Sequence, residues 1–281
     1  MTFSEFLESD QSKHPHYLLI GNPVTHSISP LMHNTALEHY NIDAQYIAVS
    51  VSLKDVAPLA AHFNSEMFLG ANITIPHKQT FLEVVDELSD TASEIGAINT
   101  LIKKDGKLIG ENTDAYGFMF PMEELELEPD PDRAIIFGVG GATKAIVYAL
   151  QEYGFQEICM VSRNPDRIDP QDGIIACSYD SWQDYADDAT LIVNATPLGM
   201  SPNVEASPVN DEEVELLIGK LCYDIVYNPR ETKFLRQANT VQAELLGGLD
   251  MLIHQGAKSF KLWTGKEFPV GLVKMKLDEL F

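Results

Sequence analysis

Basic residues are scarce in this chain of 281 residues. Lysine and arginine together number 19 against 42 aspartates and glutamates, so the formal net charge is −23. A chain so acidic is repelled by phosphate backbones and anionic headgroups, which argues against nucleic acid or a membrane surface as a partner. The acidic excess is compatible with a solubilising surface and with adaptation to a salt-rich cytoplasm, and the sequence leaves both open.

Cysteines and long apolar runs are also few. Cys159, Cys177 and Cys222 are widely spaced in apolar, strand-like runs, which predicts buried free thiols rather than metal ligands or nucleophiles. Histidines and acids show no metal-ligand spacing, so no metal site is expected. No apolar run is long enough to cross a bilayer. Residues 1–14 are polar and do not form a secretory signal, so we expect a cytoplasmic protein.

The apolar residues, 45% of the chain, suffice for a sizeable core, and the length fits two domains. Strand-like and helical runs alternate through the first part, which predicts an α/β fold with a mostly parallel sheet covered by helices. The expected strands are 17–21, 44–51, 69–74, 97–102 and 107–110, and the expected helices are 31–40, 53–63, 81–88 and 112–127.

A proline-broken acidic linker, residues 128–132, precedes a second alternating unit. Its expected strands are 134–137, 157–161, 174–178, 191–195 and 221–225, with a helix at 142–153. This pattern suits a nucleotide-binding sheet. The tail from Leu249 is expected to be helical, to dock on the first domain, and to bury Leu252, Phe260, Leu262 and Trp263.

A glycine-rich turn lies between the first strand and the first helix of the second unit. It reads Gly138-Val139-Gly140-Gly141-Ala142, and Thr143 stands where the common dinucleotide fingerprint has a third glycine. Such a turn lets the backbone and the helix N-terminus approach a pyrophosphate. A tight structural turn without a ligand remains the alternative.

Polar side chains follow several predicted strands of the first unit. Ser27 and Ser29 follow the first strand, Thr74 and Lys78 the third, and Asn99 lies in the fourth. Ligands of open α/β sheets bind at the carboxyl ends of strands, and hydroxyls there suit a polyol or a carboxylate. Ser29 also fits the N-cap of a helix whose first residue is Pro30, and Lys78 also fits an ordinary solvated lysine.

Asp114 opens the helix that follows the first sheet, where an acid complements the helix dipole. Paired with Lys78, it would instead form a lysine–carboxylate couple that relays a proton to a substrate hydroxyl.

The strand after the glycine turn is followed by Arg163 where an enzyme for NAD would place an acid, with Arg167 four residues on. An acid there holds the ribose hydroxyls of NAD, whereas two guanidiniums clamp a 2′-phosphate. We therefore expect NADP, with surface arginines as the alternative. Residues 194–200, which include Thr196, are expected beside the cofactor, Gly248 near the nicotinamide and Gln255 at the substrate.

These ordered motifs together resemble the shikimate dehydrogenase family from about Gly21 to Gly265, nearly the whole chain. The resemblance implies NADP-dependent, reversible reduction of 3-dehydroshikimate to shikimate in the biosynthesis of chorismate and aromatic amino acids. It also implies a substrate-binding catalytic domain of residues 1–115 plus 249–281 and a Rossmann-like NADP-binding domain of residues 116–248, with the active-site cleft between them. A monomer or homodimer is expected.

The resemblance also implies roles for single residues. Lys78 and Asp114 would be the catalytic pair. The substrate would contact Ser27, Ser29, Thr74, Asn99, Asp114, Tyr227 and Gln255. NADP would contact Asp90, Gly138, Val139, Gly140, Gly141, Ala142, Ser162, Arg163, Asn164, Arg167, Thr196, Ile225 and Gly248.

Two rival functions remain open at this stage. A quinate/shikimate dehydrogenase would accept a further ring hydroxyl and could use NAD, and Arg163 with the paired serines favours the strict enzyme. A non-catalytic NADP-binding sensor would keep the fold without turnover, and the presence of both Lys78 and Asp114 argues against it.

Overall fold

The computed structural model describes residues 1–125, 133–169 and 171–280, and the expected linker 128–132 lies outside them. The chain divides into two compact units. The first unit comprises Met1–Thr113 and Gln255–Phe281, and the second comprises Asp114–His254. No helix of the described residues has both the length and the apolar content that a membrane span requires.

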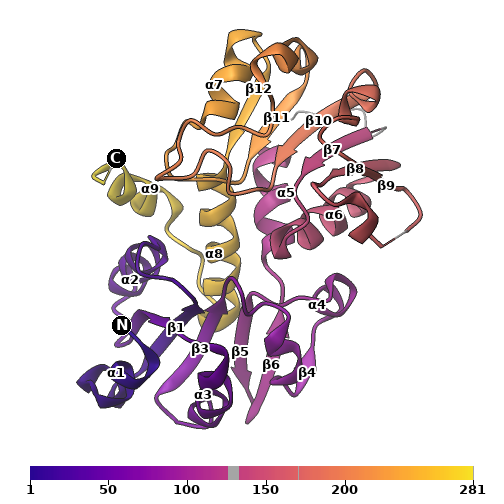
Figure 1. The fold of residues 1–281 in the computed structure, drawn as a ribbon. Coiled ribbons are helices and arrows are strands. Elements are labelled where there is room, and N and C mark those ends of the chain that lie inside the picture. The colour runs from indigo at the N-terminus through magenta and orange to yellow at the C-terminus, as the bar shows by residue number, and fades with distance from the viewer. Residues whose placement is uncertain (126–132, 170, 281) are drawn as a thin grey trace. The chain divides into compact units, whose positions relative to one another are not determined.

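The first unit contains a mixed six-stranded sheet (Figure 1). Its strands are β1 (His16–Gly21), β2 (Gln45–Ser50), β3 (Phe68–Ile73), β4 (Glu87–Leu88), β5 (Thr100–Lys104) and β6 (Lys107–Glu111), in the order β2-β1-β3-β5-β6-β4. β1 runs parallel to β2 and β3, while β5 runs antiparallel to both β3 and β6. The sheet is therefore less parallel than the alternation of elements predicted.

Short helices connect these strands. They are α1 (Phe3–Glu8), η1 (Asp10–Lys13), α2 (Ser29–His39), η2 (Leu53–Asp55), α3 (Val56–His62), η3 (Thr80–Glu83) and α4 (Asp90–Ile95). The helix expected at 81–88 is wrong, because only the turn η3 and the two-residue strand β4 form there. The core contains Leu18 and Ile20 of β1 together with Phe6, Phe68 and Phe81.

The tail is helical, as expected, with α8 (Gly248–Thr264) and α9 (Val270–Asp278). α9 packs against α2 within the first unit. Phe260 is buried, but Leu262 is exposed, so its assignment to the core is wrong. Residues three or four apart share a face of a helix, and the residue four before Leu262 on α8 is Lys258, a charged side chain.

The second unit contains a fully parallel six-stranded sheet. Its strands are β7 (Arg133–Phe137), β8 (Glu157–Val161), β9 (Ile174–Cys177), β10 (Ala189–Asn194), β11 (Leu221–Asp224) and β12 (Glu244–Gly247). The order β9-β8-β7-β10-β11-β12 is the doubly wound order of dinucleotide-binding sheets, with its switch point between β7 and β10. Residues 134–137 are fully buried, as expected for a central parallel strand.

The helices of this unit are α5 (Asp114–Glu124), α6 (Gly141–Tyr153), η4 (Pro165–Arg167), η5 (Trp182–Tyr185), η6 (Asp211–Leu217) and α7 (Lys233–Thr240). α5 packs against α6, and α7 lies against β11 and β12 (Figure 1). Sequence analysis missed β12, because its four residues carry only a brief apolar pair between the exposed Glu244 and a glycine.

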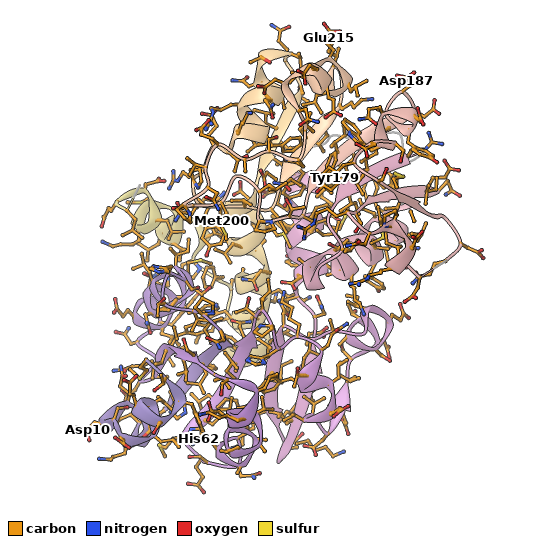
Figure 2. All side chains as sticks on the ribbon, in the orientation of Figure 1. Asp10, His62, Tyr179, Asp187, Met200 and Glu215 are labelled. Atoms are coloured by element: carbon orange, nitrogen blue, oxygen red, sulfur yellow. A yellow bond between two sulfur atoms is a disulfide. The ribbon has the colours of Figure 1, made fainter. Side chains whose placement is uncertain are left out.

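Acidic side chains project into solvent from both units. Asp10 of the first unit and Asp187 and Glu215 of the second are exposed and stand out from the ribbon in Figure 2. Water solvates such charges at little cost, because they are not transferred into the apolar interior. This placement agrees with the solubilising surface that the composition suggested.

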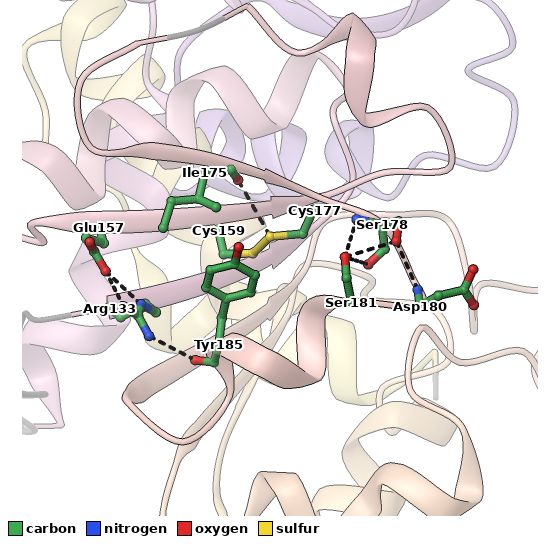
Figure 3. Close-up of a disulfide and its surroundings, with 9 residues drawn as sticks. All are labelled: Arg133, Glu157, Cys159, Ile175, Cys177, Ser178, Asp180, Ser181 and Tyr185. Carbon is green, nitrogen blue, oxygen red and sulfur yellow. Dashed lines mark hydrogen bonds and ion pairs between the residues drawn. A yellow bond between two sulfur atoms is a disulfide. The ribbon is translucent and has the colours of Figure 1, made fainter.

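Cys159 and Cys177 form a disulfide between the neighbouring strands β8 and β9 (Figure 3). The expectation of free thiols is therefore wrong for these two residues and confirmed for Cys222, which is buried and unbridged. Eighteen residues separate the two bridged cysteines along the chain. Their closeness follows from the pairing of β8 with β9, which cysteine spacing alone does not reveal.

A buried carboxyl anchors the loops that follow β10 and β11. Asp224 accepts hydrogen bonds from the Thr232 hydroxyl (2.6 Å), the Val226 amide (2.9 Å) and the Asn194 side-chain amide (3.1 Å). Burial outweighs these bonds and raises the pKa of Asp224 to about 6. Asn194 in turn accepts bonds from the amide and hydroxyl of Thr196, which shapes the segment 194–198.

The disulfide predicts the number of reactive thiols. Protein unfolded without a reductant should show one thiol, that of Cys222, and protein unfolded after treatment with dithiothreitol should show three. Titration with a chromogenic disulfide reagent measures both numbers, and Cys222→Ser is the control that should lower each by one. Three thiols without reduction would contradict the bridge.

Thr232→Ala should destabilise the protein in a pH-dependent way. A carboxyl whose folded pKa of about 6 exceeds its unfolded value binds its proton more tightly when folded. The free energy of unfolding from this group therefore falls as pH rises from about 4 to about 6. Above that range the charged carboxylate depends on its donors, so losing the hydroxyl should cost about 1–3 kcal/mol at pH ~8 and less at pH ~5.

Denaturant unfolding at the two pH values measures this difference. Thr240→Ala is the control, because Thr240 is the last residue of α7, the helix that Thr232 caps, and its hydroxyl donates to a backbone carbonyl, that of Gln237. Equal losses for Thr232→Ala at both pH values would contradict the assignment.

Candidate active site

The ends of several strands of the first unit meet at one edge of the sheet. β1 and β3 are parallel and end at Gly21 and Ile73, and β5 pairs antiparallel with β3, so that Thr100 lies opposite Asn72. The loops that carry the predicted substrate residues Ser27, Ser29, Thr74, Lys78 and Asn99 therefore leave from the same edge. We call this edge with its loops the polar edge.

A close backbone approach ties two of these loops together. A Cβ on Gly21 would lie 2.4 Å from the Thr74 methyl carbon and 3.0 Å from the Ile75 carbonyl oxygen, so only glycine fits there. The Asn22 amide donates to that same carbonyl (2.9 Å), and the Thr74 amide donates to Ile20 (2.8 Å). Ile75 lies beyond the end of β3 and is exposed.

The two serines lie together in the loop after β1. The Ser27 hydroxyl is 3.2 Å from the Ser29 hydroxyl and accepts a bond from the Ser29 amide, also at 3.2 Å. Ser29 is the first residue of α2 and not its N-cap, which is Ile28 and makes no side-chain capping bond. The predicted capping role is thus wrong, and capping does not account for the buried Ser29 side chain.

Lys78 is half-buried, and its carbonyl accepts the Ile98 amide at 2.9 Å. This bond fixes the lysine backbone beside the segment that carries Asn99. The neighbouring His77 is buried, and its Nε2 lies 2.7 Å from the Val51 carbonyl oxygen.

Asn99 and Gln255 are buried and in contact. The Asn99 amide nitrogen lies 3.3 Å from the Gln255 side-chain oxygen, and the Thr113 backbone amide donates to the Asn99 oxygen at 2.7 Å. Both predicted substrate residues therefore belong to one hydrogen-bonded network of the first unit. The other half of the predicted catalytic pair, Asp114, is a buried residue that opens α5 of the second unit.

The glycine turn lies at the switch point of the second sheet. Gly138 has φ +116°, and a Cβ there would lie 3.0 Å from the Ala195 carbonyl oxygen at the end of β10. Gly140 caps α6 with open space where a side chain would be, and Gly141 begins the helix. Val139 is half exposed and Ala142 is half-buried. The turn therefore leaves backbone amides at a helix N-terminus without covering side chains.

Two arginines follow β8. Ser162 is buried, and its hydroxyl accepts the Asn164 amide at 3.1 Å, while Arg163, Asn164 and Arg167 are exposed. Asp166 lies in the following turn η4. Tyr179, labelled in Figure 2, stands close enough to Arg163 for the cation to lower its pKa, although burial has the larger effect and raises it. Sequence analysis missed Tyr179 because it follows a different strand.

The remaining predicted residues are distributed between the units. Tyr227, Thr196 and Ile225 are half-buried in the loops after β11 and β10 of the second unit. A Cβ on Gly248 would lie 2.2 Å from the Ile225 carbonyl oxygen, so packing against Ile225 already requires glycine there. Asp90 is exposed at the start of α4, in the first unit, whereas all other predicted cofactor residues lie in the second.

Models of protein families match two parts of the chain. Residues 19–101 match the shikimate dehydrogenase substrate binding domain, and residues 248–277 match the shikimate 5'-dehydrogenase C-terminal domain. A curated relative from Moorella thermoacetica, shikimate dehydrogenase (NADP(+)), is 38% identical over 272 residues, which cover 93% of this chain and 92% of the relative.

Solved structures share the fold. Shikimate 5-dehydrogenase from Thermus thermophilus, in complex with NADP(H) and shikimate, superposes with a TM-score of 0.82 at 31% identity, covering 95% of this chain and all of that one. Quinate dehydrogenase from Corynebacterium glutamicum, in complex with NAD, gives 0.86 at 29% identity, covering 94% and 99%. The similarity to curated relatives extends along nearly the whole chain, and these relatives are named as shikimate dehydrogenases that use NADP(+), so the chain belongs to the shikimate dehydrogenase family.

Proposed function

We propose that this protein catalyses the reversible, NADP-dependent interconversion of 3-dehydroshikimate and shikimate in aromatic biosynthesis. The carrying observation is the polar edge, which gathers hydroxyls, an ammonium and an amide where a small polyhydroxy acid would bind. Ser27 and Ser29 suit the substrate carboxylate, since two adjacent hydroxyls can both donate to it. Thr74, Asn99 and Gln255 suit ring hydroxyls, and Tyr227 would line the same site.

The second unit is proposed to hold NADP. The Gly138–Ala142 turn would receive the pyrophosphate at the N-terminus of α6, and Arg163 and Arg167 would hold the 2′-phosphate with Ser162 and Asn164. Thr196, Ile225 and Gly248 would lie near the nicotinamide end. Asp90 remains a prediction, because it belongs to the first unit, whereas the other predicted cofactor residues belong to the second. The bound cofactor supplies the hydride.

The chain's own residues are proposed to manage charge and proton at the carbonyl. The Lys78 ammonium would stabilise the alkoxide that develops at the reduced carbon and help deliver its proton. Asp114 would accept a hydrogen bond from the lysine and keep it oriented. In the reverse direction the pair would take the proton from the shikimate hydroxyl.

A quinate dehydrogenase in complex with NAD is equally similar in structure. Overall similarity therefore does not distinguish NADP from NAD, and the residues after β8 have to be compared instead. Arg163 and Arg167 are exposed at the end of β8, and no acid occupies the position that binds ribose hydroxyls in NAD enzymes. This favours NADP and the strict shikimate enzyme. We propose a cytoplasmic enzyme, as a monomer or homodimer. A disulfide is uncommon in a reducing compartment, so the thiol titration also bears on the proposed cytoplasmic location.

Lys78→Ala should lower kcat for shikimate oxidation by ~10²–10⁴-fold, the range of general acid–base catalysis, and leave the Kd for NADPH nearly unchanged. Steady-state kinetics and fluorescence titration measure the two quantities. Lys104→Ala is the matched control, because Lys104 is an exposed lysine at the far end of β5. A wild-type kcat for Lys78→Ala would remove the lysine from the chemistry.

Cofactor and substrate choice are tested by kcat/KM for shikimate and quinate, each with NADP and NAD. Wild-type protein should prefer shikimate with NADP. Arg163→Ala should lower kcat/KM with NADP by ~10–100-fold, the loss of a hydrogen bond to a charged group, and leave the value with NAD unchanged. Arg236→Ala is the control, because Arg236 is a half-buried arginine on α7 that pairs with Glu205. Tight NADP binding without any turnover would instead indicate a sensor.

A further inference from the structure

Ser259 is a fully buried residue of α8, one helical turn beyond Gln255. Its hydroxyl donates to the Gln255 carbonyl at 3.0 Å and accepts from the Asn72 side-chain amide, also at 3.0 Å. It lies 2.8 Å from the Thr100 hydroxyl and 3.1 Å from the Thr113 hydroxyl. One side chain thus joins α8 to β3, to β5 and to the segment before α5.

The direction of these bonds can be traced from a backbone amide, which can only donate. The Thr113 amide donates to the Asn99 side-chain oxygen at 2.7 Å, and this fixes the Asn99 amide nitrogen on the other side. That nitrogen then donates to the Gln255 side-chain oxygen at 3.3 Å. Gln255 consequently accepts from Asn99 through its oxygen, and its own amide nitrogen, a donor, points elsewhere.

Asn72 is oriented by a backbone carbonyl, which can only accept. The Asn99 carbonyl accepts from the Asn72 side-chain nitrogen at 3.2 Å, so this nitrogen faces Ser259 as well, and the Asn72 oxygen accepts from the Tyr46 hydroxyl at 2.7 Å. A serine hydroxyl has one proton and two lone pairs. Because its proton is donated to the Gln255 carbonyl, the Ser259 oxygen can accept from Asn72 and from one threonine. Its hydrogen-bonding capacity is then filled.

We infer that Ser259 is a positioning residue, which holds Gln255 and Asn99 so that the Gln255 amide nitrogen donates to a ring hydroxyl of the substrate. This inference rests on the proposed function, because only that function makes the two amides substrate ligands. Ser259 touches neither substrate nor cofactor in this scheme. Its hydroxyl donates to the Gln255 carbonyl and accepts from the Asn72 side-chain amide. These two bonds hold the helical turn that carries Gln255 in register with β5.

Ser259→Ala should raise KM for shikimate about 10-fold, with kcat changed less and the Kd for NADP unchanged. Thr264→Ala is the matched control, since Thr264 lies on the same helix and its hydroxyl makes the same bond to the fourth residue back, Phe260 (2.7 Å), outside the network. Its KM should equal that of wild type. Ser259→Cys keeps the volume but is a weak donor, so it should also raise KM.

A double-mutant cycle separates positioning from general damage. If Ser259 acts through Gln255, then Ser259→Ala should add little to the KM of Gln255→Ala. Fully additive effects, or a wild-type KM in both Ser259 variants, would overturn the inference. Should Ser259→Ala fail to fold, Ser259→Cys in the same cycle decides. Wild-type protein without shikimate turnover would instead reject the proposed function, and the two failures are therefore distinguishable.

Discussion

The candidate site depends on strand ends that approach too closely for a side chain. At Gly21 in the first sheet and at Gly138 in the second, an added Cβ would fall within 2.4 to 3.0 Å of the neighbouring chain. At Gly21 this brings the serine loop against the loop of Thr74 and Lys78. At Gly138 it brings the turn into α6 against the end of β10, at the switch point between β7 and β10, and Gly140 of that turn has open space where a side chain would be. Each unit therefore builds its candidate binding region from backbone geometry first and from side chains second.

Buried polar groups impose the second constraint. Asn72, Asn99 and Ser259 are nearly inaccessible to water, so each needs partners inside the protein. The partners that they find connect β3 and β5 with α8, and the predicted substrate residues Asn99 and Gln255 share them. A network of this kind leaves few alternative arrangements. A flipped Asn99 amide would set its nitrogen against the Thr113 backbone amide, and a flipped Asn72 amide would set its oxygen against the Asn99 carbonyl. Asp224 has the corresponding role in the second unit, where it holds the loops after β10 and β11.

Local patterns predicted much of this structure. The buried runs of β7 and β10 and the glycine turn identified the second sheet, because parallel strands buried on both faces read as continuous apolar segments. The polar residues after β1 and β3 were found by the rule that ligands bind at carboxyl ends. By contrast, β12 and the 81–88 region carry too weak a periodicity, and the antiparallel course of β5 has no local signature.

Features that depend on contacts between distant segments were missed. The Cys159–Cys177 bridge requires the pairing of β8 with β9. The same pairing underlies the effect of Arg163, which follows β8, on the pKa of Tyr179, which follows β9. Gly248 was expected to face the nicotinamide, and the structure adds a packing reason through Ile225. Ser259 could have been noticed as the residue four positions after Gln255 on a predicted helix, but its partners on β3 and β5 are visible only in the folded protein.

A crystal structure with shikimate and NADP bound would show whether the polar edge binds the substrate beside Lys78 and Asp114. We expect the shikimate carboxylate on Ser27 and Ser29 and a ring hydroxyl that accepts from the Gln255 amide nitrogen. We also expect the Lys78 ammonium within hydrogen-bonding distance of both Asp114 and the reacting oxygen. Shikimate bound away from the polar edge, or Lys78 and Asp114 far apart in that complex, would contradict it.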